Sequence, residues 1–263
     1  MRFFKTGLTG VFLLAAICTQ AAYQVEITFA NGAKRVAEEL VVQSGKVILA
    51  EENLSVPFEQ IQSVNFTFDE PLTSSECDGF LKRGTYGELV ERLNSLLDPV
   101  KQGLALPGNM DLYVQYKMRA CFWAGKFDDA RAMAQVLVSK KSSYAPLASL
   151  YTVVIMLEQD QPDDAVSDAF EKIENPDAVS GAIAEYIRGR LAMNIRQYEP
   201  ALQHFSNVLV FYGRDPEWVP AATFQEGLVY KKTGYLESAA NVAEELEIAY
   251  PDSYWGSRAD ELK

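Results

Sequence analysis

The stretch KTGYLESAANVAEELEIAYPDS, from Lys232 to Ser253, contains the pattern that decides the fold. Gly234 is followed directly by an aromatic residue, and five residues after the glycine stands Ala239. A long run with helical apolar spacing then ends at a Tyr-Pro pair. A single helix needs no such order of signals, but a helix that ends at glycine and is followed at once by a second helix does. The stretch therefore predicts an antiparallel helical hairpin.

The same order of residue types occurs four more times upstream. The stretches are RGTYGEL (83–89), AGKFDDA (124–130), QDQPDDA (159–165) and IRQYEPA (195–201), in addition to TGYLESA (233–239). Their last residues, Leu89, Ala130, Ala165, Ala201 and Ala239, are 41, 35, 36 and 38 residues apart. Recurrence with this period predicts five helical hairpins stacked side by side.

Small residues have a defined role at three places in each hairpin. Gly84, Gly125 and Gly234 are predicted to end the first helices in a left-handed conformation, which costs little without a side chain. The residue five positions later is predicted to let the second helix approach the first. Gly189 and Gly227, seven positions before the turn, are predicted to allow the same approach from the first helix.

These residues resemble the tetratricopeptide repeat, whose period is about 34 residues. The best match is GLVYKKTGYLESAANVAEELEIAYP (227–251), and GRLAMNIRQYEPALQHF (189–205) is next. The resemblance covers residues 70–263 and implies a right-handed α-solenoid of about five hairpins with a C-terminal capping helix. The ending YPDSYWGSRADELK is similar to repeats of the outer-membrane barrel-assembly lipoprotein and of the cell-division coordinator associated with the Tol-Pal system. The family implies binding of a protein or peptide.

In such a solenoid the first helices line the inner face. Placing the repeats by the resemblance predicts a partner-binding groove made of apolar, aromatic and isolated cationic side chains. Its residues are Gln115, Arg119, Phe122, Leu150, Val154, Tyr186, Arg190, Met193, Phe224, Leu228 and Lys231. Tyr, Phe and Arg are the side chains that concentrate binding energy at interfaces. The alternative is that the apolar residues pack between hairpins and that Arg119 and Arg190 form salt bridges inside the repeat.

Residues 1–21 have the features of a secretory signal peptide. Arg2 and Lys5 form a basic start. Residues 8–17 form an apolar run that is too short to cross a bilayer, and small residues follow it. We therefore expect an exported protein, in the periplasm or outside the cell.

Cleavage is expected after Ala21 or Ala22. A retained N-terminal anchor and a lipid attached to Cys18 are the alternatives. The chain from residue 22 onward has 22 basic and 36 acidic residues, and this negative charge argues against nucleic acid as a partner. No later segment is long and apolar enough to cross a membrane.

Residues 22–69 have the period of strands instead of helices. YQVEITF (23–29) alternates, ANG (30–32) is a hairpin signal, and ELVVQSGKVILAEE (39–52) holds two strands joined at Ser44-Gly45. VPFEQIQSVNFTF (56–68) gives a turn that contains proline and then a last strand. The segment resembles the small SH3-like or Sm-like barrels that precede helical repeats in bacterial envelope proteins, and a plain hairpin meander is the alternative.

No group of residues predicts catalysis. The single histidine, His204, falls on a predicted helix surface without a nucleophile beside it, and no phosphate-binding loop or dinucleotide fingerprint is present. Cys77 and Cys121 do not make a zinc site; an oxidising compartment would permit a disulfide between them, and two free buried thiols are slightly favoured. We expect no cofactor, no metal and no enzymatic activity.

The sequence thus predicts a binding scaffold of the cell envelope, which holds a protein or peptide and associates peripherally with envelope complexes. The alternative is a structural protein that forms homo-oligomers, with the β module of one copy docking on another through exposed strand edges. An enzyme of a type that the sequence does not reveal is the least favoured class.

Overall fold

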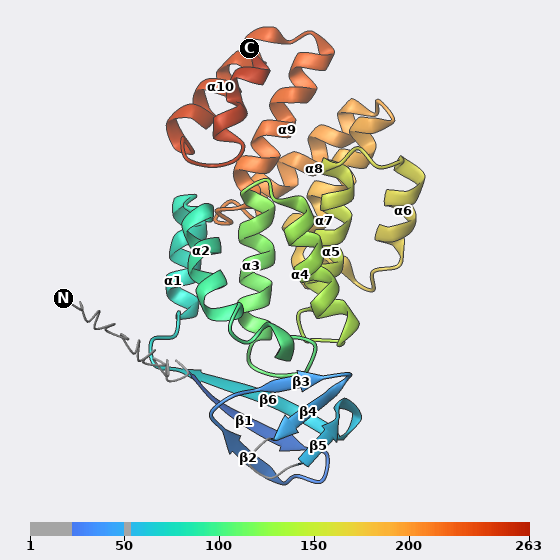
Figure 1. Cartoon of the computed structure of the whole chain (residues 1–263). Coiled ribbons are helices and arrows are strands. Elements are labelled where there is room, and N and C mark those ends of the chain that lie inside the picture. Colours follow the sequence, from blue (N-terminus) through green and yellow to red (C-terminus); the bar gives the residue numbers. More distant parts are fainter. Residues whose placement is uncertain (1–22, 50–53) are drawn as a thin grey trace, which may run out of the picture.

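The computed structural model describes residues 23–49 and 54–263 (Figure 1). A small β module at one end is followed by helices that form the rest of the molecule. Every strand of the described residues lies before Asp69, which confirms the predicted change from strands to helices near Pro71. The predicted signal peptide, residues 1–21, lies outside the described residues.

The β module contains two antiparallel sheets of three strands each. The first has the order β2-β1-β6 and consists of β1 (Tyr23–Phe29), β2 (Lys34–Ala37) and β6 (Ile61–Phe68). The second has the order β3-β4-β5 and consists of β3 (Val41–Gln43), β4 (Lys46–Leu49) and β5 (Leu54–Pro57). A short 3-10 turn, η2 (Phe58–Gln60), leads from β5 to β6.

The predicted alternation along β1 is confirmed, since Val25 and Ile27 are fully buried. The predicted turn at Ser44 and Gly45 is also confirmed, and both residues have positive φ (51° and 73°), as a tight two-residue hairpin requires. The sequence did not predict β5 as a strand. Pro57 ends that strand, where its missing N–H costs no ladder bond, and the turn follows it.

The helices form five consecutive hairpins, as the repeat predicted. The pairs are α1 (Ser74–Arg83) with α2 (Tyr86–Leu97), α3 (Asp111–Trp123) with α4 (Phe127–Ser139), α5 (Ala145–Glu158) with α6 (Asp163–Glu171), α7 (Pro176–Asn194) with α8 (Tyr198–Phe211), and α9 (Trp218–Thr233) with α10 (Leu236–Ala249). Each second helix contacts the first helix of the next hairpin. The first helices α3, α5, α7 and α9 also contact one another in succession.

All five hairpin turns place a residue in the left-handed region at the same position. The predicted glycines have φ of 75° (Gly84), 70° (Gly125) and 87° (Gly234). The two hairpins without glycine adopt the same conformation at Asp160 (φ 50°) and Arg196 (φ 61°). The repeat therefore imposes this backbone geometry even where a side chain makes it unfavourable.

The third hairpin departs from the pattern at its second helix. Ala165 was predicted to face the first helix, but it is exposed, and the neighbouring Val166 is buried in its place. Pro162 caps α6 in an extended conformation (φ −53°, ψ 136°), so α6 begins three residues after Asp160. The other second helices begin two residues after their turn residue, and this offset of one position moves the buried side chain by one.

Close packing within the last two hairpins depends on glycine, as predicted. A Cβ on Gly189 would lie 2.5 Å from the Phe205 ring, and one on Gly227 would lie 2.8 Å from a methyl group of Val242. Real Cβ atoms do not approach other atoms so closely. These glycines set the distance between the two helices of each hairpin.

The β module is attached to the helices by the loop before α3. The N–H of Val64 in β6 donates to the carbonyl of Pro107 (2.8 Å). The Asn109 side chain accepts from the N–H of Phe66 (2.9 Å) and donates to its carbonyl (2.7 Å). A Cβ on Gly108 would lie 1.8 Å from the Val64 carbonyl oxygen, so only glycine fits there. The loop thus pairs with the outer edge of β6.

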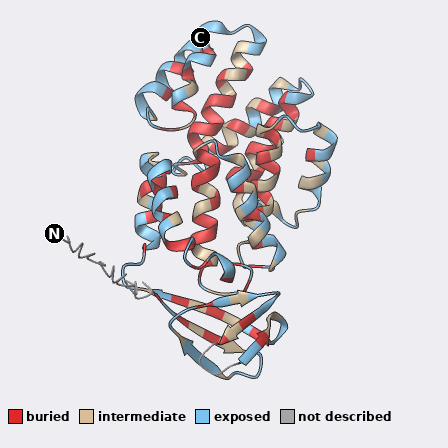
Figure 2. Ribbon diagram, in the orientation of Figure 1, coloured by how far each residue is buried: buried red, intermediate tan, exposed pale blue. Residues whose placement is uncertain are grey.

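Buried residues are concentrated on the middle helices, and α3 and α9 are buried along most of their length (Figure 2). The predicted C-terminal cap is present as a 3-10 helix, η4 (Gly256–Leu262), instead of an α-helix. It packs against α9 and α10 and buries Ala259 and Leu262. Within the described part of the chain, no helix has both the length and the apolar character that a membrane crossing requires.

The shared turn geometry leads to a stability prediction. Arg196 is exposed and left-handed, so Arg196→Gly should raise the free energy of unfolding by about 0.5–1 kcal/mol. The converse change Gly234→Ala, at φ 87°, should lower it by about 1 kcal/mol. Urea unfolding followed by circular dichroism measures both, and a destabilising Arg196→Gly would contradict the interpretation.

Candidate functional site

The predicted groove on the first helices is closed in this structure. Eight of its eleven residues are buried: Gln115, Phe122, Leu150, Val154, Tyr186, Arg190, Met193 and Phe224. Arg119, Leu228 and Lys231 are partly exposed. The prediction of an open groove therefore does not hold for the buried side chains, because other parts of the chain cover them.

Arg119 is held by a buried carboxylate at the start of α9. Its guanidinium forms a salt bridge with Glu217, which is 3% exposed. The same carboxylate accepts hydrogen bonds from Trp123 Nε1 (2.6 Å) in α3 and from the Tyr151 hydroxyl (3.0 Å) in α5. Burial disfavours the charged guanidinium, but the Glu217 carboxylate outweighs this effect and raises the pKa of Arg119. We call these four residues the Glu217 cluster; they join α3, α5 and α9.

Asp215 orients the backbone that carries Glu217. Its carboxylate accepts hydrogen bonds from the backbone N–H groups of Glu217 and Trp218, both at 3.0 Å. Burial raises the pKa of Asp215, and the neighbouring Glu217 charge raises it further. The start of α9 is therefore fixed by its own acidic residues as well as by Arg119.

Arg190 is held in a second buried group. It forms a salt bridge with Glu158, and its Nη1 donates to the Tyr186 hydroxyl (2.9 Å). The same hydroxyl donates to Glu158 (3.1 Å) and accepts from Gln225 Nε2 (3.2 Å). The alternative that the sequence left open, internal salt bridges for both arginines, is therefore the one that the structure shows.

All three tryptophans of the chain meet where the hairpins converge. The rings of Trp123 and Trp218 have centroids 4.9 Å apart, and those of Trp123 and Trp255 are 6.5 Å apart. The last loop also reaches the first hairpin, since a Cβ on Gly84 would lie 2.8 Å from the Asp252 carbonyl oxygen. The series of hairpins thus curves until its two ends touch, and side chains fill its inner face.

Sequence reasoning missed Glu217, Trp123, Tyr151 and Trp255. Glu217 and Trp255 lie between or after the repeats, where the period assigns no role. The available signal was the pair of groove arginines, because a buried arginine needs a carboxylate partner. The sequence pattern alone does not say which of the many acidic residues supplies it.

The cysteines and the histidine have structural environments. Cys77 and Cys121 are both buried free thiols, so the possible disulfide is not formed. Burial raises the pKa of each thiol to about 11. His204 is partly exposed, and its Nδ1 lies 3.1 Å from Glu185. No group of three or more metal-ligating side chains occurs among residues 23–49 and 54–263.

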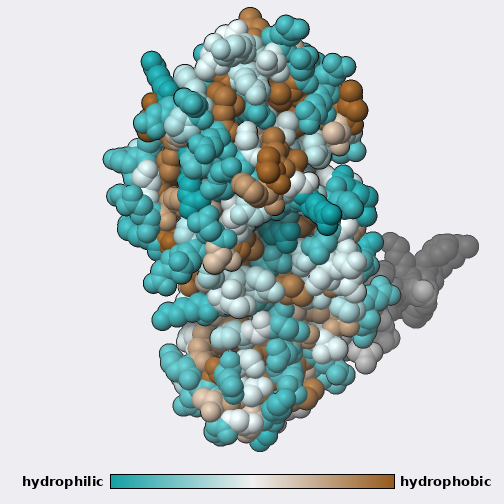
Figure 3. Space-filling view, turned by 180° about the vertical axis from the view of Figure 1, so that it is seen from behind, coloured by the Kyte–Doolittle hydropathy of each residue, from teal (hydrophilic) through white to brown (hydrophobic). Residues whose placement is uncertain are grey.

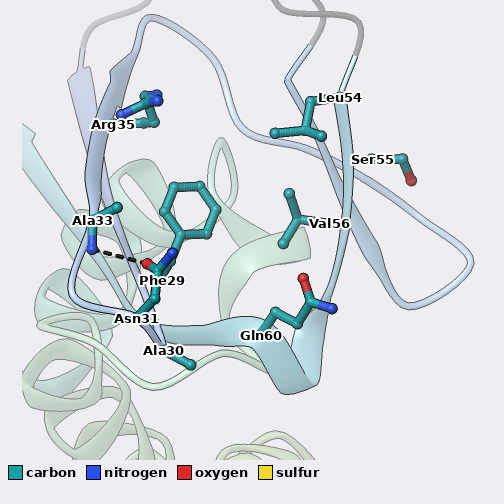
Figure 4. Close-up of a pocket in the computed structure, with 9 residues that line it drawn as sticks. All are labelled: Phe29, Ala30, Asn31, Ala33, Arg35, Leu54, Ser55, Val56 and Gln60. Atoms are coloured by element: carbon teal, nitrogen blue, oxygen red, sulfur yellow. Dashed lines mark hydrogen bonds between the residues drawn. The ribbon is translucent and has the colours of Figure 1, made fainter.

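One hollow of the surface lies in the β module (Figure 4). It has a volume of about 380 Å³ and lies between the β1–β2 hairpin on one side and β5 with Gln60 on the other. Phe29, Leu54 and Val56 provide apolar walls, and Asn31, Arg35 and Gln60 provide polar groups. We call it the β pocket.

The β pocket is an open part of the module's interior. Arg35 pairs with Ile27 across β1 and β2, so both side chains lie on the face that forms the core. Leu54 pairs with the buried Leu49 and also lies on the core face, yet Leu54 is 42% exposed. A core-facing leucine that stays exposed indicates that β2 and β5 do not close the module between them.

The two strands beside the β pocket each have an edge without a strand partner. Among the described residues, β2 pairs only with β1, and β5 pairs only with β4. The outer edge of β6 differs, because the loop at residues 107–109 covers it. Backbone groups on an open edge are available to an incoming extended chain.

The helical part offers less defined surfaces. Figure 3 shows a mostly hydrophilic face with separate apolar groups. Val210 and Phe211, at the end of α8, are among the exposed apolar residues (73% and 72%). A shallow hollow of about 520 Å³ lies between α4, α5 and α6, and its walls are mixed.

A scan against protein-family models finds no match for this chain, and comparisons with curated proteins and with solved structures find no match either. The resemblance to tetratricopeptide repeats therefore rests on the residues of the chain alone.

The Glu217 cluster predicts a large effect of one substitution. Glu217→Ala leaves Arg119, Trp123 Nε1 and the Tyr151 hydroxyl without their acceptor, and should lower the free energy of unfolding by about 3–5 kcal/mol. Asp177→Ala removes the exposed partner of Arg188 and should cost no more than about 1 kcal/mol. Urea unfolding measures the free energy of unfolding of both variants. Equal losses would show that the Glu217 cluster stabilises the fold no more than an exposed ion pair does.

The thiols give a prediction that depends on pH. A pKa of about 11 leaves Cys77 and Cys121 about one part in a thousand ionised near pH 8, so a thiol reagent should not label the native chain that starts at Tyr23. Labelling should increase as the pH rises toward 11, because the thiolate is the reactive form. Unfolding without a reductant should expose two thiols per chain; none would mean that a disulfide joins them.

Proposed function

We propose that this protein is an exported helical-repeat scaffold that binds an extended segment of a partner protein in the cell envelope, and that it is not an enzyme. The observation that carries the proposal is the β pocket: a hollow with apolar walls and a few polar groups, open to the surface, between two strands that each have one edge without a strand partner among the described residues. Apolar walls with a few convergent polar groups are the usual composition of a binding site.

The strand edges favour an extended peptide over a compact small molecule. A peptide that lies along β2 or β5 can exchange backbone hydrogen bonds with the open edge, and this supplies affinity without a particular sequence. An apolar side chain of the same peptide would enter between Phe29 and Leu54, where an exposed core-facing leucine lacks cover. Covering that leucine supplies the hydrophobic contribution, and the pocket selects the side chain.

The architecture that we propose is a right-handed solenoid of the tetratricopeptide type with an SH3-like module in front. The contacts of each second helix with the following first helix, and the left-handed residue at all five turns, support the solenoid. The order β2-β1-β6 and β3-β4-β5, with a 3-10 turn before the last strand, supports the SH3-like module. Export follows from the predicted signal peptide at residues 1–21.

The same open edges support one alternative, association of two copies through β2 or β5. The edge of β6 is covered, and on the edge of β3 the N–H of Val42 already donates to Gln102 Oε1 (3.2 Å), so β2 and β5 are the more open of the four described edge strands. Light scattering over a concentration series distinguishes the alternatives, because a chain that remains monomeric at every concentration excludes self-association as the function.

The β pocket predicts which substitution abolishes binding. Peptides are selected from a random library displayed on phage, with the chain starting at Tyr23 as bait. Leu54→Glu should weaken their binding at least about tenfold, because it places a charge on the open core face where the apolar side chain would lie. Isothermal titration measures the affinities.

Leu236→Glu is the matched control, since Leu236 is exposed on α10, far from the β module in the fold. It should leave the affinity unchanged. Selected peptides that bind both variants as tightly as the unaltered chain, or a selection that returns no specific peptide, would refute the β pocket as the binding site.

A further inference from the structure

The C-terminal segment occupies the face that the sequence predicted to bind a partner. We call residues 250–262, which leave α10 and include η4, the strap. The Trp255 side chain, 1% exposed, packs against Phe224 (ring centroids 4.9 Å apart) and Tyr186 (6.5 Å). Phe224 and Tyr186 both belong to the predicted groove. Arg258 lies over the Phe224 ring, 4.9 Å from its centroid.

Few polar interactions attach the strap to the rest of the molecule. In the described structure, the N–H groups of residues 251–263 that form backbone hydrogen bonds donate to carbonyls within residues 250–263. Lys231 Nζ donates to the carbonyls of Glu261 (2.8 Å) and Lys263 (3.0 Å), and Lys263 pairs with Glu247 on α10. The Lys231 and Lys263 contacts are exposed ones, and such contacts contribute little to stability. Apolar packing of side chains such as Trp255 therefore supplies most of the attachment.

Polar atoms beside the contact between the strap and the inner face lack partners. Within the described part of the chain, Trp255 Nε1 has no hydrogen-bond partner, and neither have Arg190 Nε and Gln225 Oε1, whose side chains bond to Tyr186 under Trp255. Arg190 and Gln225 both donate to the Tyr186 hydroxyl, which places the two side chains next to each other. An unpaired buried polar atom costs roughly 1–3 kcal/mol. A peptide backbone carries one donor and one acceptor and would satisfy Gln225 and Arg190 better than the indole does.

We propose that the strap is a displaceable internal ligand, and that the inner face binds a peptide with an aromatic residue followed three positions later by arginine, as in Trp255 and Arg258. The strap then competes with that peptide for Tyr186 and Phe224. The proposal is independent of the β pocket, which lies in the β module. It restores the predicted groove as a binding surface that is closed until a partner displaces the strap.

Hydrogen exchange tests whether the strap opens on its own. In native conditions with low denaturant, the amides of residues 256–262 should exchange at least about 100-fold faster than the buried amides of α5 and α7, through an opening that does not unfold the helices. Exchange of the strap only together with α5 and α7 would overturn the proposal, because the strap would then be a fixed part of the core.

Binding in trans tests the ligand. A labelled peptide with the sequence of residues 250–260 should bind the variant Lys231→Ala several-fold more tightly than the unaltered chain. The variant loosens the internal strap, whereas this peptide lacks the Glu261 and Lys263 carbonyls that Lys231 binds. Lys232→Ala is the matched control, since Lys232 is the exposed neighbour and, in the part of the chain that the structure describes, it makes no hydrogen bond or ion pair with the strap. It should bind like the unaltered chain.

A second peptide with alanine at the position of Trp255 should not bind. Equal binding of both peptides, or no binding to Lys231→Ala, would overturn the proposal. The variant Leu54→Glu should bind the strap peptide normally, so failure of this inference and failure of the β pocket are distinguishable.

Discussion

The buried carboxylate of Glu217 is the constraint on which the arrangement of the helices depends. A charge in the interior is tolerated only when it is paired and fully hydrogen-bonded. Glu217 finds its partners far back in the chain, with Arg119 on α3 98 residues before it and Tyr151 on α5 66 residues before it. Stacked hairpins contact only their neighbours along the series, so local packing alone does not fix how far the series curves. The Glu217 cluster fixes the curvature of the series, because α9 must begin where the side chains of Arg119 and Tyr151 can reach the Glu217 carboxylate. Trp218 follows directly and fills the space that this curvature encloses.

The fold was largely predictable because its signals are local. A glycine in the left-handed region, a small residue one helical turn later and a proline after the last helix each act within a few residues, so the sequence shows them directly. The errors have the same local origin. Pro162 shifts the start of α6 by one residue, so Val166 is buried where Ala165 was predicted to be buried. The strand β5 was missed because a three-residue turn, and not Pro57 itself, separates it from β6.

The candidate site was less predictable because it depends on distant contacts. The positions of Arg119, Tyr186 and Phe224 on the inner side of the first helices follow from helical spacing. Whether an inner position is open depends on what the series of hairpins encloses. That depends on Trp218 and Trp255, which lie at the ends of repeats, where the period carries no information. The β pocket was missed for a related reason, since an open core appears only once the pairing of β2 and β5 is known.

The two surfaces proposed for binding differ in what a partner must overcome. At the β pocket the outer edges of β2 and β5 have no strand partner among residues 23–49 and 54–263. A peptide that binds there loses its own conformational entropy and displaces water, but displaces no strand of the described structure. At the inner face a peptide must also displace the strap, whose affinity benefits from being part of the same chain. A peptide from another protein competes best with that high local concentration when it also pairs the polar atoms that the strap leaves unpaired, such as Arg190 Nε. The inner face should therefore be the more selective of the two surfaces, since a partner that repeats only the apolar contacts of Trp255 displaces the strap weakly unless a substitution such as Lys231→Ala has loosened it.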